Sequence, residues 1–322
     1  MEKKLTLTFV MLFCIIIAHA QVAEYFFTQQ QLTYTEITGG TVLWTATFDN
    51  EISTEISIPS FTFNKTTYTS LYVSANGFIT FGAAPLPNNY QPISHISTSY
   101  TGAISAFGCN LTQADQGTPE VRYQQVGNEF VIQWKDVGRY NTSSDIISFQ
   151  IRLNTSNSNI SIVYGGTINP GASSSQPQVG IRGENYLDYN SRTIPSNTGN
   201  WINSSKSTNV SQTMYFYSSY PATVPSPGLT FSWLPLYNPS DFTAYAIDLN
   251  KVKVNWEKNL SNNNVLLVVH TSYFFSGTPE NGTSYPVGST TPDNGTVIYS
   301  GGNTSFQHIN LNPGTEYYYK IW

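Results

Sequence analysis

The chain has 322 residues, of which only 10% are charged and 14% are aromatic, and its formal net charge is −5. This composition excludes a coiled coil or long helical bundle, and the acidic balance disfavours a protein that binds nucleic acid. The many Tyr, Phe, Thr and Val residues instead predict an all-β protein, and the length is enough for two domains, each with its own core.

Residues 1–20 have the three parts of a secretory signal peptide: two early lysines, an apolar run over residues 5–18, and a small-x-small site that ends at Ala20. Because the apolar run is shorter than the about 20 residues of a spanning helix, we predict cleavage rather than a membrane anchor. The mature chain is therefore expected to be secreted or held at the cell surface. It keeps one cysteine, Cys109, which we expect to be buried and unreactive.

Residues 21–235 read as strands separated by turns, and three hairpins stand out. Asn76-Gly77 predicts a type I′ turn within residues 71–81, and residues 120–134 and 146–164 each contain two β-rich runs around a polar turn. Consecutive hairpins form an antiparallel meander, and this region lacks a sustained helical period. We therefore predict an antiparallel β-sandwich of the jelly-roll kind.

Strand signals weaken over residues 166–210, so we predict long surface loops there, and loops on a rigid scaffold often carry binding residues. Exposed aromatic rings in such loops would stack on a sugar ring, while polar neighbours would bind its hydroxyls. The candidate ligand-binding residues are Tyr186, Tyr189, Trp201, Arg182 and Asp188. The alternative is that these rings cap the end of the sandwich core.

A proline-bounded linker at residues 236–239 leads to a second domain at residues 240–322. Val252, Val254 and Trp256 alternate there with polar residues, which predicts a strand with one buried face. Near the end of the chain, the run Leu311-x-Pro313-x-Thr315-x-Tyr317-x-Tyr319 leads into a late strand.

Together with Trp256, this run resembles a fibronectin type III domain. The resemblance implies an immunoglobulin-like sandwich with Trp256 in its core and Tyr317 as the tyrosine corner, whose hydroxyl binds nearby backbone. Leu311 and Pro313 are likewise expected to be structural. Because the last strand of that fold would follow Trp322, we expect the domain to be truncated and the sequence to be part of a longer protein.

The first domain also has a resemblance, carried by the segments VSANGFITFG (73–82), FVIQW (130–134) and FQIRL (149–153), the last followed by ISIVY (160–164). These segments are similar to the nidogen-like extracellular module and to N-terminal sandwiches of bacterial surface proteins. In combination with a fibronectin type III domain, the resemblance implies an exported multidomain protein of the type IX secretion kind.

Catalytic motifs are missing from the sequence. His95, His270 and His308 have no metal-binding spacing, and no G-x-S-x-G elbow occurs, so we predict no enzyme activity, no cofactor and no metal. A glycosidase would need two acids that face each other in one cleft. A calcium site is a second open alternative, because loop carboxylates suit this ion, although no Asp-x-Asp-x-Asp loop occurs. The acids considered for the glycosidase are Glu120, Glu129, Asp136, Asp145, Glu184 and Asp188, and those for calcium are Asp136, Asp145 and Asp188.

These observations predict a secreted or surface region that binds or adheres without catalysis. Its expected partners are a glycan or a surface protein and further domains of the same chain, with no nucleic acid and no membrane span after signal cleavage. The alternative is a pair of accessory domains of a secreted hydrolase, a protease or a glycosidase, whose catalytic domain lies beyond residue 322.

Overall fold

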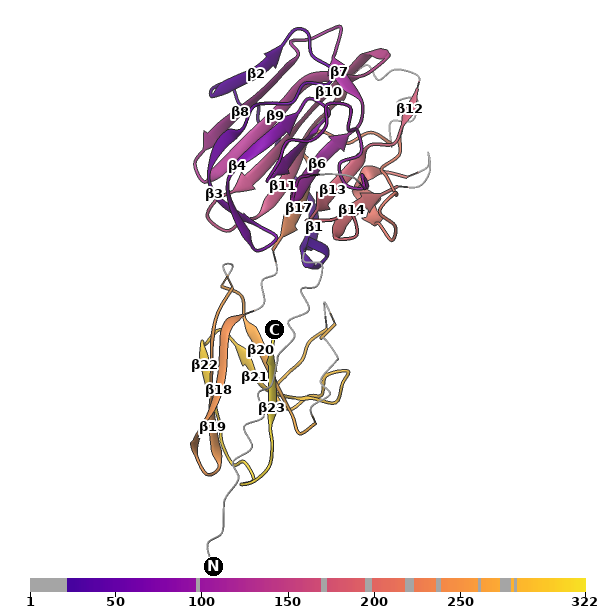
Figure 1. Cartoon of the computed structure of the whole chain (residues 1–322). Helices are drawn as coiled ribbons and strands as arrows, with labels where there is room; N and C mark the ends of the chain where they lie inside the picture. The colour runs from indigo at the N-terminus through magenta and orange to yellow at the C-terminus, as the bar shows by residue number, and fades with distance from the viewer. Residues whose placement is uncertain are drawn as a thin grey trace, which may run out of the picture. The chain divides into compact units, whose positions relative to one another are not determined.

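The computed structural model of the chain (Figure 1) falls into two units, the first ending at Trp233 and the second starting at Leu234. The residues that it describes are 22–96, 99–168, 173–194, 199–217, 223–235, 239–259, 262–272, 279–280 and 283–322. The predicted signal peptide and most of the predicted linker lie outside these residues.

The first unit is a sandwich of two sheets whose central strands are antiparallel, so the predicted all-β fold class is confirmed. The larger sheet has the order β1-β17-β11-β10-β9-β8-β2, and β7 also pairs with β9. Its strands are β1 (Phe26–Gln31), β2 (Thr41–Thr45), β7 (Leu111–Gln113), β8 (Glu120–Val126), β9 (Glu129–Arg139), β10 (Thr142–Asn154), β11 (Ile160–Ile168) and β17 (Leu229–Leu234).

The second sheet of this unit has seven strands in the order β15-β14-β13-β6-β5-β4-β3. Its strands are β3 (Ile56–Phe63), β4 (Thr66–Ser74), β5 (Phe78–Phe81), β6 (Gly102–Gly108), β13 (Gln178–Arg182), β14 (Tyr189–Thr193) and β15 (Ser205–Lys206). Smaller elements are the two-stranded pair β12 (Ser174–Ser175) and β16 (Phe216–Tyr217) and the 3₁₀ turns η1 (Val22–Glu24) and η2 (Trp201–Asn203).

The core lies between the inner faces of the two sheets. Phe149 of β10 stacks on Trp134 of the same sheet at 5.2 Å between ring centroids, and on Phe107 of the opposite sheet at 5.9 Å. Along β9, however, the outward-facing Val131 and Gln133 are also buried. A strand that is buried on both faces needs a cover on the outside of its sheet.

That cover is residues 32–40, which we call the strap. The strap joins β1 to β2, which are the opposite edges of the larger sheet, six inter-strand spacings apart. Six spacings of about 4.8 Å make about 29 Å. Ten Cα steps at full extension reach only about 33–36 Å, so the strap has to run almost straight across the outer face.

Two buried glutamines of the sheet fix the strap in place. The carboxamide of Gln133 accepts from the backbone N–H of Ile37 at 2.9 Å and donates to the carbonyl of the same residue at 3.3 Å. Gln150 of β10 donates to the carbonyl of Thr35 at 2.8 Å and to Gln133 at 2.7 Å. These bonds satisfy backbone groups of the strap that would otherwise be buried without partners.

The three predicted hairpins are present, as β4–β5, β8–β9 and β10–β11. The predicted type I′ turn is wrong, because Ser74 pairs with Phe78 and the turn therefore has three residues, of which only Gly77 has a positive φ, at 82°. Asn76 is instead fully buried, and its side chain accepts from the backbone N–H of Leu111 at 2.9 Å.

Residues 166–210 depart from the prediction of long surface loops. They contain β13, which is completely buried and pairs with β6 in the middle of its sheet, and β14, which pairs with β13. The strands were missed because polar residues such as Gln178 and Asn190 are buried in them by hydrogen bonds, so the apolar pattern that marks a strand is weak.

The second unit has two three-stranded sheets, in the orders β18-β19-β22 and β21-β20-β23. Their strands are β18 (Ser240–Asp248), β19 (Lys251–Glu257), β20 (Val265–His270), β21 (Thr296–Gly301), β22 (Ser305–His308) and β23 (Tyr318–Ile321). Val254 and Trp256 of β19 are buried in a small core with Leu267, as the alternation along that strand predicts. Leu311 is buried, Pro313 is exposed, and the hydroxyl of Tyr317 accepts from the backbone N–H of Asn312 at 3.0 Å.

Candidate functional site

The predicted aromatic platform is not assembled. Trp201 is completely buried, stacks on Phe107 with ring centroids 6.0 Å apart, and donates from its indole N–H to the carbonyl of Tyr215 at 3.0 Å. The expectation of an exposed ring is therefore wrong for Trp201, which follows the alternative of a ring in the core. Tyr186 and Tyr189 are half-buried.

Arg182 and Asp188, expected beside those rings at the surface, are buried as well. The Arg182 guanidinium lies over the Tyr100 ring at 5.0 Å and donates to the carbonyl of His95 at 2.8 Å, and burial lowers its pKa. Asp188 Oδ1 accepts from the backbone N–H groups of Val22 at 3.0 Å and Ala23 at 3.4 Å. Arg182 thus holds the segment at His95, and Asp188 holds the backbone of Val22 and Ala23.

Most of the acids considered for catalysis or calcium have partners from the protein. Asp145 is buried in an ion pair with Arg139, and Asp136 accepts from the backbone N–H of Thr118 at 2.8 Å. Glu129 pairs with Arg152, and Glu184 is exposed. Within the part of the chain that the structure describes, no group of three or more His, Cys, Asp or Glu residues is placed to hold a metal ion.

Of the candidate histidines, His270 and His308 belong to the second unit, and His95 belongs with Cys109 to the first. The Nδ1 atom of His270 accepts from the backbone N–H of Ser272 at 2.7 Å, and Nδ1 of His308 lies 3.0 Å from the hydroxyl of Tyr319. Burial lowers the pKa of His308 and raises the pKa of the Cys109 thiol. A thiol with a raised pKa carries little thiolate, which is the reactive form.

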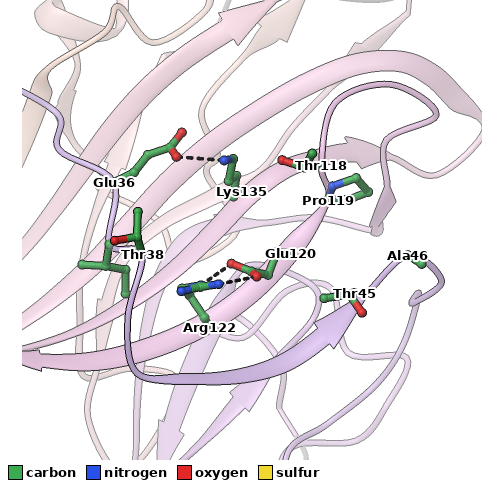
Figure 2. Close-up of a pocket in the computed structure, with 10 residues that line it drawn as sticks. Glu36, Thr38, Thr45, Ala46, Thr118, Pro119, Glu120, Arg122 and Lys135 are labelled. Atoms are coloured by element: carbon green, nitrogen blue, oxygen red, sulfur yellow. Dashed lines mark hydrogen bonds and ion pairs between the residues drawn. The ribbon is translucent and has the colours of Figure 1, made fainter.

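A hollow of about 380 Å³ lies where the strap meets the larger sheet (Figure 2), and we call it the strap hollow. The strap forms one wall and contributes Glu36, the end of β2 forms another wall, and β8 and β9 supply the other charged groups of the lining. Its lining residues are Glu36, Ile37, Thr38, Thr45, Ala46, Thr118, Pro119, Glu120, Arg122 and Lys135.

Strand geometry brings four charged side chains into the strap hollow. Glu120 and Arg122 are two positions apart on β8, so they point to the same face, and Lys135 of β9 is directly opposite Glu120. Glu36 reaches in from the strap. Figure 2 shows two ion pairs, one between Arg122 and Glu120 and one between Lys135 and Glu36, the latter with 2.8 Å from Nζ to Oε2.

The two ion pairs favour the charged form of both cations. Hydrogen bonding to Glu120 raises the pKa of Arg122, and hydrogen bonding to Glu36 raises the pKa of Lys135. Arg122 also donates from Nη1 to the carbonyl of Gly39 at 3.0 Å, which ties β8 to the strap. The wall and the charged floor of the hollow are therefore fixed to each other.

Sequence reasoning named Glu120 as a candidate acid but missed Glu36, Arg122 and Lys135. The i, i+2 spacing of Glu120 and Arg122 on a predicted strand was a usable signal for a shared face. The path of the strap could not be predicted in this way. It depends on the pairing of β1 with β17, a strand about 200 residues later in the sequence.

The sandwich of the first unit matches a known protein family. A family model described as NIDO related matches residues 24–235, which is more than half of the chain. The chain belongs to the NIDO-related family. The match spans both sheets of the first unit and the strap hollow, and it bears out the resemblance to a nidogen-like sandwich.

Membership of the NIDO-related family indicates an extracellular, non-catalytic kind of module. No curated protein matches the chain. Among the described residues of this NIDO-related chain, no helix has the length and apolar character that crossing a membrane would require.

Proposed function

We propose that the NIDO-related unit is an extracellular recognition module, secreted or at the cell surface, which binds its partner in the strap hollow and serves adhesion. One observation carries this proposal: four charged side chains line a single open hollow and are held there by a pinned strap. Groups that are already ordered lose little conformational entropy on binding, so a preformed site suits recognition.

The strap hollow is better suited to binding than to catalysis. Both of its carboxylates are engaged in ion pairs, and its lining contains no His, Cys or Ser that would act as base or nucleophile. The proposed role is therefore non-catalytic, with a glycan or a surface protein as the partner.

We also propose that the second unit is a fibronectin type III domain that acts as a spacer. The sheet orders β18-β19-β22 and β21-β20-β23 support this assignment, because they match strands A, B, E and C′, C, F of an immunoglobulin-like sandwich. Trp256 in the core and the hydrogen bond from Asn312 N–H to the hydroxyl of Tyr317 support it further.

Blocking the hollow tests the recognition role. Residues 21–322 are purified and passed over immobilised glycans and extracellular proteins, and binding is followed by biolayer interferometry. Thr45→Trp puts a large ring into the hollow, and we expect it to reduce binding at least about tenfold, as loss of one well-packed contact would. Thr41→Trp, on the same strand outside the hollow, is the control.

Retention of wild-type binding by Thr45→Trp would contradict a binding role for the strap hollow. An equal loss in Thr41→Trp would point to damage of β2 instead of obstruction. Melting temperatures of both variants separate this case from a true block, because both positions are exposed on the same strand.

A further inference from the structure

We infer that the ligand of the strap hollow is an uncharged, hydroxyl-rich molecule, namely one or two sugar rings of a glycan. The inference rests on the proposed binding function of the hollow and specifies its ligand. It follows from the charges, the spare hydrogen-bonding capacity and the size of the lining.

The charges of the hollow are already balanced. Glu36 and Glu120 oppose Lys135 and Arg122, and each acid has its own cation. The side chains of Arg122 and Glu120 are only 14% and 16% exposed. A charged ligand group that replaced one partner of this pair would leave a mostly buried charge behind, which is unfavourable. A neutral ligand leaves both pairs intact.

The same groups keep spare donors and acceptors. The guanidinium of Arg122 has five N–H groups, and its described bonds to Glu120 and Gly39 use three of them. Lys135 uses one of three N–H groups on Glu36, whose other carboxylate oxygen has no described bond. Each sugar hydroxyl both donates and accepts, so neighbouring hydroxyls match this alternation of donors and acceptors.

The size and polarity of the lining agree with a small sugar. At about 380 Å³ the hollow is near the lower end of the about 300–1,000 Å³ of ligand pockets. Thr38, Thr45 and Thr118 add hydroxyl groups to the lining, which contains no aromatic ring. Without a ring for stacking, one site should bind weakly, and adhesion would rely on several copies bound at once.

The test uses residues 21–322 and probes of similar size but different charge. Cellobiose, lactose and N,N′-diacetylchitobiose are the neutral probes, digalacturonate is the anionic probe and the dipeptide Lys-Lys the cationic one. Saturation-transfer NMR and calorimetric titration measure binding. We expect a neutral disaccharide to bind with an affinity that changes less than about twofold between low and high salt, because screening acts on charged contacts.

Two substitutions connect that binding to the hollow. Glu36→Gln removes the charged acceptor that has a free carboxylate oxygen, and we expect it to weaken the neutral disaccharide about tenfold, the loss typical of a charge-assisted hydrogen bond. Glu129→Gln is the matched control, because Glu129 forms a similar ion pair with Arg152 on the same sheet but does not line the hollow. The control should bind as the wild type does.

Failure of all neutral probes to bind, tighter binding of a charged probe, or equal effects of the two Gln variants would overturn the inference. The recognition role is tested separately. If Thr45→Trp abolishes binding to one of the immobilised partners, and no neutral sugar competes with that partner, then the hollow still binds a partner. In that case only the ligand assignment is wrong.

Discussion

At the scale of single residues, several charged side chains of the first unit stabilise the fold instead of facing a ligand. Arg139 and Asp145 pair in the interior, and Asp188 holds the backbone of Val22 and Ala23. Sequence alone places such residues at the surface, because an acid or arginine in a polar segment is usually solvated. Their burial depends on partners far away in the sequence, which no local pattern reports.

The buried pair gives a test at this scale. Arg139→Met leaves the Asp145 carboxylate, which is completely buried, without its guanidinium. We expect the free energy of unfolding of the first unit to fall by about 3–5 kcal/mol, as for other broken buried ion pairs. Urea denaturation followed by tryptophan fluorescence measures the change.

Glu129→Met is the comparison for that experiment, because Glu129 pairs with Arg152 at 3.3 Å in a partly exposed position. Partly exposed pairs contribute at most about 1 kcal/mol, so its loss should be much smaller. Similar losses in the two variants would show that burial does not control the contribution of the Arg139–Asp145 pair.

At the scale of elements, local signals predicted the hairpins well and the connections poorly. Turn residues between β-rich runs located β4–β5, β8–β9 and β10–β11 correctly. The strap has no comparable signal, because it forms no strand of its own, and its path is set by the edge positions of β1 and β2 and by its bonds to Gln133 and Gln150. The strap hollow depends on that path and could not be predicted either.

Removing the hydrogen bonds of one buried glutamine should loosen the strap without unfolding the sheet. Gln133→Leu deletes the carboxamide that binds both backbone groups of Ile37. We expect the Ile37 amide to lose at least about tenfold of its protection from hydrogen exchange, because its opening no longer breaks that hydrogen bond. Exchange followed by mass spectrometry on peptides that cover residues 32–40 measures this.

Gln125→Leu controls for the loss of a carboxamide from the same sheet, since Gln125 is exposed and bonds only to the carbonyl of Gly127 among the contacts described. Its strap should exchange as in the wild type. Unchanged exchange of Ile37 in Gln133→Leu would mean that packing alone holds the strap.

At the scale of the whole molecule, composition was the most informative part of the sequence. The scarcity of charge and the abundance of aromatic and β-branched residues correctly predicted the all-β class. The same reasoning missed β13 and β14, where buried Asn, Gln, Ser and Arg replace apolar residues. A polar strand stabilised by tertiary hydrogen bonds looks like a loop until its neighbours are known.

Packed sheets, and not covalent links, have to stabilise residues 21–322, because this region contains a single cysteine, Cys109. We therefore expect its thermal unfolding midpoint to be the same with and without a reducing agent, in contrast to small exported domains held by disulfides. Differential scanning calorimetry with and without dithiothreitol measures this. A lower midpoint in the reductant would indicate a disulfide between chains.

The edge position of β1 has a consequence for the order in which the chain acquires its structure. β1 pairs with β17, and the Val22 amide binds Asp188, so the first residues of the sandwich to be synthesised meet their partners only after about 170–200 more have followed. Closing so long a loop is slow. The N-terminal stretch is therefore expected to stay unpaired and open to proteases until the last strand of the sandwich has been made.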